Sequence, residues 1–107
     1  MINVNFLTTE KGFLVGFDIY GHADYDEHGH DIVCAAVSSA AFLVVNTISD
    51  IIKVPVDAGA NEFGAMHLKI NENNASLCND ILSGLKLHLI NLEEQYPENI
   101  TVNYVEV

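Results

Sequence analysis

Hydrophobic and polar residues alternate over the first twenty positions of the chain. Ile2, Val4 and Phe6 fall on one face of a strand, and residues 8–12 have the composition of a turn. Alternation then resumes, with a hydrophobic face made of Phe13, Val15, Phe17 and Ile19. A period of two on both sides of a short turn predicts an antiparallel hairpin with one buried face.

Two longer segments have the hydrophobic spacing of helices. The first follows a loop over Gly21 to His30, begins at the N-cap candidate Asp31 and extends to about Ile52, shortly before Pro55. It is apolar almost all round, so we expect the sheet to cover one face and a second helix or a second subunit to cover the rest. The second helix is expected over roughly Ala75 to Gln95, with an apolar stripe of Leu77, Ile81, Leu85, Leu89 and Leu92.

Three further strands complete the predicted order. Their hydrophobic positions are Val54, Val56 and Ala58 in the third strand, Met66, Leu68 and Ile70 in the fourth, and Ile100 to Val107 in the last. A turn is expected at 58–61, between the third strand and the fourth. The order ββαββαβ predicts an α+β fold of two layers, in which two helices pack on a mostly antiparallel five-stranded sheet. The length of 107 residues fits a single domain, 1–107.

The charge and the cysteine content narrow the possible functions. Fifteen acidic residues against four lysines give a net charge of −11, which argues against direct binding of nucleic acid. The acidity either attracts a basic partner or only keeps the protein soluble. Two cysteines are too few for a disulfide framework, and the chain opens with a strand pattern rather than a signal peptide. The apolar stretch Ile32 to Val45 is judged too short to span a bilayer, so we expect a cytoplasmic protein that is not bound to a membrane.

The candidate chemistry lies in GHADYDEHGHDIVCAAVS, residues 21–38. If Asp31 caps the helix, Cys34 lies in its first turn, where unpaired N–H groups and the helix dipole are expected to lower a thiol pKa. Asp31, Cys34 and Ser38 share one helix face. His22, at the end of the second strand, is a candidate base that activates the thiol and later protonates the leaving group. The Asp31 charge opposes ionisation of the thiol, so its expected role is to cap the helix or to orient a histidine.

Two other interpretations of this segment remain open. Cys34 is also an acceptable small core residue, as Cys78 is expected to be in the second helix. Alternatively, His22, His28, His30 and Cys34 are four possible zinc ligands, although their spacing matches no known ligand pattern.

The motif resembles that of a known family. Gly21-His22-Ala23, then Gly29, then the run from Asp31 to Ser38 is similar to the signature of the bacterial ribosomal-processing cysteine protease family, Prp. The length, the element order and a late Tyr-Pro pair agree with this resemblance, which therefore covers essentially the whole chain.

The resemblance implies a specific activity. Members of the family remove a short N-terminal extension from the precursor of a large-subunit ribosomal protein, and they are homodimers. It implies that His22 and Cys34 are the catalytic pair, that Asp31 and Ser38 support them, and that the substrate loop hinges at Gly21 and Gly29. Neither a metal nor a cofactor is expected.

The expected mechanism is attack by the Cys34 thiolate, with backbone N–H groups at the helix start holding the oxyanion. The loop departs from the family pattern, because His28 and His30 give it more imidazole than expected. A non-catalytic binding module in ribosome assembly is the remaining alternative, although such a module has no need of an intact Cys–His pair.

Overall fold

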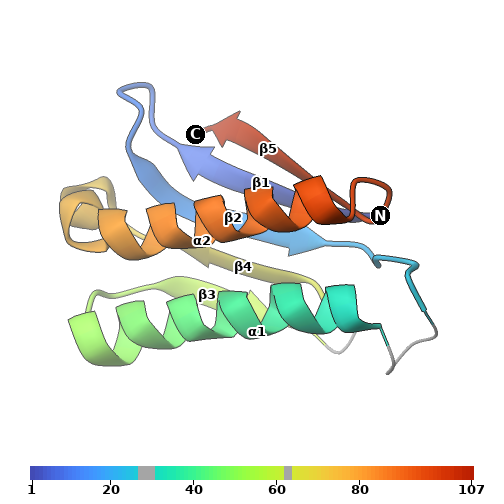
Figure 1. Cartoon of the computed structure of the whole chain (residues 1–107). Coiled ribbons are helices and arrows are strands. Elements are labelled where there is room, and N and C mark those ends of the chain that lie inside the picture. The colour runs from blue at the N-terminus through green and yellow to red at the C-terminus, as the bar shows by residue number, and fades with distance from the viewer. Residues whose placement is uncertain (27–30, 62–63) are drawn as a thin grey trace.

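The five strands of the protein form one mixed sheet in the order β3-β4-β2-β1-β5 (Figure 1). The computed structural model describes residues 1–26, 31–61 and 64–107. The strands are β1 (Ile2–Thr8), β2 (Leu14–Tyr20), β3 (Asp57–Ala60), β4 (Met66–Lys69) and β5 (Ile100–Glu106). All neighbouring pairs are antiparallel except β1 and β5, which are parallel. The predicted α+β class and the order ββαββαβ are therefore confirmed.

Both long helices lie on the same face of this sheet (Figure 1). α1 (Ile32–Asn46) continues into a π-helical segment, η1 (Thr47–Ile52), and a short 3-10 turn, η2 (Glu72–Asn74), precedes α2 (Ala75–Gln95). The core lies between the helices and the sheet, and its largest fully buried side chains include Phe6 and Phe17, which are paired across β1 and β2. The other face of the sheet carries polar residues such as Asn5 and Asp18.

Three details of the predicted strands and helices are wrong. Phe13 is 49% exposed because β2 begins one residue later, after the hairpin turn. The third strand is Asp57–Ala60, so the residues expected to form a turn at 58–61 mostly belong to the strand. Leu77 is 61% exposed, and the buried residues of α2 are instead Ala75, Cys78, Leu82, Leu85, Leu89 and Leu92.

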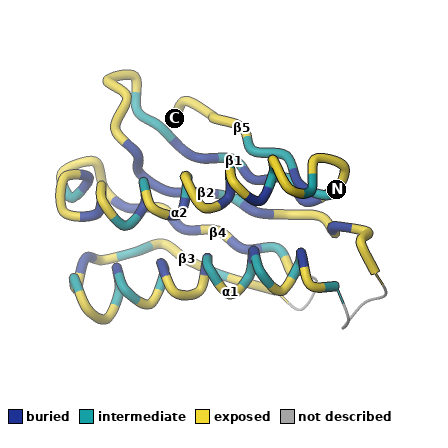
Figure 2. Tube along the Cα trace, in the orientation of Figure 1, coloured by how far each residue is buried: buried dark blue, intermediate teal, exposed yellow. Residues whose placement is uncertain are grey.

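The first helical segment is longer than the apolar stretch Ile32 to Val45, from which the sequence analysis concluded that it is too short to span a bilayer. Ile32–Ile52 forms 21 continuous helical residues, long and apolar enough by length and composition to cross a membrane, so the expectation that it was too short is wrong. It ends at Lys53, which has a left-handed backbone conformation. In the fold one side of this helix packs into the core, while much of its outer surface is exposed (Figure 2).

The topology places the motif of residues 21–38 at one end of the molecule. β2 ends and α1 begins there, and α2 runs back to the same end before the turn into β5 (Figure 1). Residues from the start of the chain, from the start of α1 and from the turn before β5 therefore meet around residues 22–26.

Candidate active site

Asp31 organises the start of α1. Its Oδ1 accepts hydrogen bonds from the N–H groups of Val33 at 2.9 Å and Cys34 at 3.0 Å, so the predicted N-cap is confirmed. Its Oδ2 accepts from the N–H groups of Tyr25 at 3.0 Å and Asp26 at 3.4 Å. Burial alone raises the pKa of Asp31, but these four N–H donors outweigh burial and hold the pKa below its ordinary value. One carboxylate thus holds both the start of the helix and residues 25–26.

Cys34 is half-buried in the first turn of α1, and its Sγ accepts a hydrogen bond from the N–H group of Ala23 at 3.3 Å. This contact brings the His22–Ala23 peptide against the sulfur, although His22 is twelve residues earlier in the chain. Ala23 is fully buried, whereas His22 is exposed. The segments that carry the predicted pair are therefore adjacent at this point.

The thiol pKa differs from the expectation. Burial raises the pKa of Cys34, the Ala23 hydrogen bond lowers it, and the nearby charges of Asp31 and Asp24 raise it again. The result is a pKa above the ordinary value, so the lowered pKa expected from the helix start is wrong. The main reason is burial of the thiol, and Asp31 adds a negative charge where the helix dipole alone would favour an anion.

The N–H groups at the helix start are also engaged. Those of Val33 and Cys34 donate to the Asp31 carboxylate, and that of Ala35 donates to the Asp31 carbonyl at 3.1 Å. The expectation that these groups hold an oxyanion does not fit this arrangement. The donor that the structure places beside the sulfur is the N–H group of Ala23.

The loop after β2 is also held by the turn between α2 and β5. Asn99 Nδ2 donates to the carbonyl oxygen of Ala23 at 2.7 Å, and the rings of Tyr25 and Tyr96 meet edge to face, with centroids 5.5 Å apart. The sequence analysis missed Asn99. The available signal was its position just before the last strand, at the end of the sheet where the loop also lies.

The remaining predicted residues have different outcomes. Ser38 is half-buried one turn after Cys34. Gly21, the expected hinge of the loop, has a φ of +93°, a backbone conformation that glycine adopts more readily than other residues. Gly29, His28 and His30 lie outside the described residues. Within the described parts of the chain, no three His, Cys, Asp or Glu side chains are grouped so as to hold a metal.

Cys78 differs from Cys34 in its surroundings. It is 0% exposed in the core, and burial raises the pKa of its thiol. The prediction that Cys78 is a small core residue is confirmed.

Comparison with known proteins gives consistent matches. A family model described as cysteine protease Prp matches residues 1–101. The ribosomal processing cysteine protease Prp of Staphylococcus aureus is 34% identical over 105 residues, which cover 97% of this chain and 99% of that protein. That of Bacillus subtilis is 27% identical over 99 residues, which cover 87% of each chain. The crystal structure of the S. aureus protease with a covalently linked product peptide covers 98% of this chain and 100% of its own, with a TM-score of 0.90 and 34% identity.

Proposed function

The chain belongs to the Prp family of ribosomal-processing cysteine proteases, and we propose that it removes a short N-terminal extension from the precursor of a large-subunit ribosomal protein, with Cys34 as nucleophile and His22 as base. The observation that carries this assignment is the Ala23 N–H on the Cys34 sulfur, because it brings the peptide of His22 to the thiol. Asp31 supports the pair through its four hydrogen bonds, and Ser38 lies one turn further along the same helix face.

The proposed reaction has two steps. The Cys34 sulfur attacks the carbonyl carbon of the scissile bond as its proton passes to His22, and His22 then delivers that proton to the departing amine. Water hydrolyses the resulting thioester and restores the thiol. Because the thiol pKa is raised in the free protein, we expect the proton transfer to accompany attack on bound substrate. The covalently linked peptide of the S. aureus relative supports a bond between protease and peptide.

The test is cleavage of a peptide that spans the N-terminal extension. Wild type is compared with Cys34→Ala, His22→Ala and the control Cys78→Ala, each with and without a chelator. We expect only wild type and Cys78→Ala to cleave, regardless of chelator, because Cys78 is buried in the core. Activity that survives Cys34→Ala contradicts the thiol mechanism, and loss of activity with chelator favours the metal-site alternative.

The net charge of −11 suits a basic substrate protein. An acidic protease attracts a basic ribosomal protein over a distance, and salt screens this attraction. Raising the salt concentration is expected to slow cleavage of the full precursor more than cleavage of a neutral peptide. Equal slowing of both substrates contradicts an electrostatic contribution.

We propose that the enzyme works in the cytoplasm, because its proposed substrate is the precursor of a ribosomal protein.

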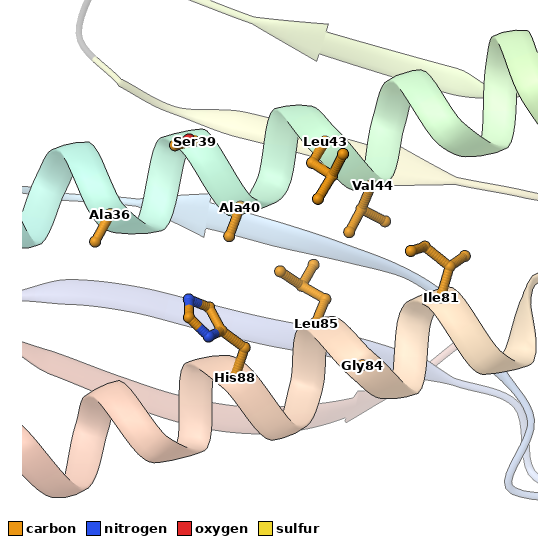
Figure 3. A pocket seen from close by; sticks show the side chains of 9 residues that line it. All are labelled: Ala36, Ser39, Ala40, Leu43, Val44, Ile81, Gly84, Leu85 and His88. Carbon is orange, nitrogen blue, oxygen red and sulfur yellow. The ribbon is translucent and has the colours of Figure 1, made fainter.

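A homodimer is the second part of the proposal, and the helical face supports it. A groove of about 540 Å³ runs between α1 and α2 (Figure 3). Apolar side chains such as Leu43 and Ile81 line it, and Leu43 is 63% exposed. The most apolar stretch of 18 residues within Ile32–Ile52 is only 28% buried in a single chain. A large apolar surface of this helix therefore stays uncovered. A second copy of the chain is the partner we propose for this face.

Sedimentation measures the proposed dimer directly. Leu43→Glu places a charge in the groove and is expected to give a monomer. Phe13→Glu changes another large, exposed hydrophobic residue, on the hairpin away from the groove, and is expected to leave the dimer intact. A wild-type protein that sediments as a monomer contradicts the proposal that a second copy covers this face. Flotation of the wild type with lipid vesicles also contradicts it, because a membrane would then cover the face.

A further inference from the structure

The turn between α2 and β5 reaches the candidate active site through one side chain. Asn99 Nδ2 donates to the carbonyl oxygen of Ala23 at 2.7 Å, although the two residues are 76 positions apart. The contact is partly buried, so solvent competes with it less than at an open surface.

Asn99 is itself held firmly by its backbone. Its N–H donates to the carbonyl oxygen of Tyr96 at 2.9 Å, and its carbonyl oxygen accepts from the N–H of Ile2 at 2.8 Å. The second bond extends the parallel pairing of β1 with β5, which begins with Ile2 opposite Ile100. The amide of Asn99 is therefore presented from a fixed position at the end of the sheet.

Ala23 is bonded on both sides. Its carbonyl accepts from Asn99, and its N–H donates to Cys34 Sγ at 3.3 Å. Ala23 is completely buried but has no side chain beyond a methyl group, so hydrogen bonds must supply much of its orientation. We propose that Asn99 is a positioning residue that holds the N–H of Ala23 against the Cys34 sulfur. This inference rests on the proposed role of Cys34 as nucleophile.

The expected consequence concerns ionisation of the thiol. The N–H of Ala23 stabilises the thiolate, whereas the carboxylates of Asp31 and Asp24 destabilise it. His22, the proposed base, directly precedes Ala23 in the chain. If Asn99 no longer fixes Ala23, the loop is free to turn its N–H away while Asp31 stays in place. The thiol then loses its donor and keeps its opposing charge.

The test measures Cys34 directly, by the rate of iodoacetamide alkylation as a function of pH. Mass spectrometry of the peptide that contains Cys34 separates it from the buried Cys78. In Asn99→Ala we expect the thiol pKa to rise by about 1, which leaves about tenfold less thiolate at neutral pH. Asn99→Leu has nearly the shape of Asn without the donor, and it is expected to give the same rise if the alanine variant folds poorly.

A matched control is Asn71→Ala. Asn71 also bonds a turn, with its Oδ1 accepting from the N–H of Asn73 at 2.9 Å. It lies at the opposite end of α2, a helix of 21 residues and hence about 30 Å long. Its replacement is expected to lower the melting temperature without changing the thiol pKa.

The outcomes separate this inference from the proposed function. A thiol pKa in both Asn99 variants equal to that of wild type overturns the positioning role, whether or not the protein cleaves the precursor peptide. A raised pKa in both variants supports the positioning role, even if the wild-type protein cleaves no precursor peptide and the proposed function fails.

Discussion

Replacing Asp31 by Asn separates two effects that one carboxylate now exerts. The charge of Asp31 raises the pKa of the Cys34 thiol, and its two oxygens accept four backbone hydrogen bonds. Asn is as good an N-cap as Asp, so its oxygen is expected to keep the bonds to Val33 and Cys34. Its NH₂ group cannot accept from the N–H groups on the loop side. Asp31→Asn therefore removes the charge and the loop anchor but keeps the helix cap.

The effect on the thiol follows from Coulomb's law. Asp31 Oδ1 accepts from the N–H group of Cys34 at 3.0 Å, which places the carboxylate within the range of about 4–6 Å at which a charge shifts a neighbouring pKa. At about 6 Å, an effective dielectric constant between about 20 and 80 gives roughly 0.7–2.8 kcal/mol, the upper value being reduced by solvent screening at this half-exposed site. That range lowers the thiol pKa by about 0.5–2. Because nucleophilicity falls as a thiol becomes more acidic, alkylation at neutral pH is expected to accelerate about two- to tenfold.

Asp31→Asn is also expected to loosen the loop, and this lowers the rate of peptide cleavage although the thiol becomes more reactive. The N–H of Tyr25 loses its acceptor at 3.0 Å, and the longer bond from Asp26 is lost with it. Such bonds contribute about 0.5–1.5 kcal/mol each. We expect a small loss of stability but a clear loss of peptide cleavage, because this segment follows His22 and Ala23 directly.

The assay compares two rates in one preparation of Asp31→Asn. Iodoacetamide alkylation of Cys34 is expected to rise while kcat/KM for the precursor peptide falls. Cys34→Ala supplies the background rate for both measurements. A folded Asp31→Asn protein whose thiol reacts no faster than wild type would refute the electrostatic reasoning, and unchanged cleavage would refute the anchoring role of the loop-side oxygen.

Two further substitutions and two pH dependences have expected outcomes. Gly21→Ala should abolish most cleavage, because φ is +93° and an added Cβ would lie 2.3 Å from the carbonyl oxygen of Met1; the peptide assay checks this. Alkylation of Cys34 should still rise above pH 9, since its pKa is raised above the ordinary 9.0, and a plateau below pH 9 contradicts this. The stabilising contribution of Asp31 should be complete above its ordinary pKa of 3.8 and disappear as the pH falls through its lower folded pKa, as measured by denaturation of wild type against Asp31→Asn. In the Leu43→Glu background, which is expected to be monomeric, Gly84→Ala should raise the free energy of unfolding by about 1 kcal/mol, because the added methyl meets nothing within 4 Å in a helix of the single chain.

Much of the fold could be predicted because its periodicities are local. The alternation in β1 and the Asp31 cap depend on neighbouring residues, and both are confirmed. The errors arise where tertiary packing decides. Leu77 fits a hydrophobic stripe, yet α2 is rotated so that Cys78 and Leu82 face the core. The sequence contains no local signal for that rotation.

The candidate site shows the same division. His22, Asp31 and Cys34 lie within thirteen residues, and their motif is readable in one dimension. Asn99 is remote in sequence, and only the parallel pairing of β5 with β1 brings it beside Ala23. Predicting it required the strand order of the sheet, which hydrophobic patterns do not determine.

The two cysteines show why a helix start alone does not define a reactive thiol. Cys34 and Cys78 both lie in the first turn of a helix, and burial raises the pKa of both. They differ in what surrounds the sulfur. Cys34 is half-exposed, receives the N–H of Ala23 and faces a carboxylate, whereas Cys78 is enclosed by the core. The ionisation of Cys34 is therefore set by burial and the charges of Asp31 and Asp24, which oppose the thiolate, against the N–H donor of Ala23, which favours it. A substrate that displaces or neutralises these charges shifts this balance toward the thiolate.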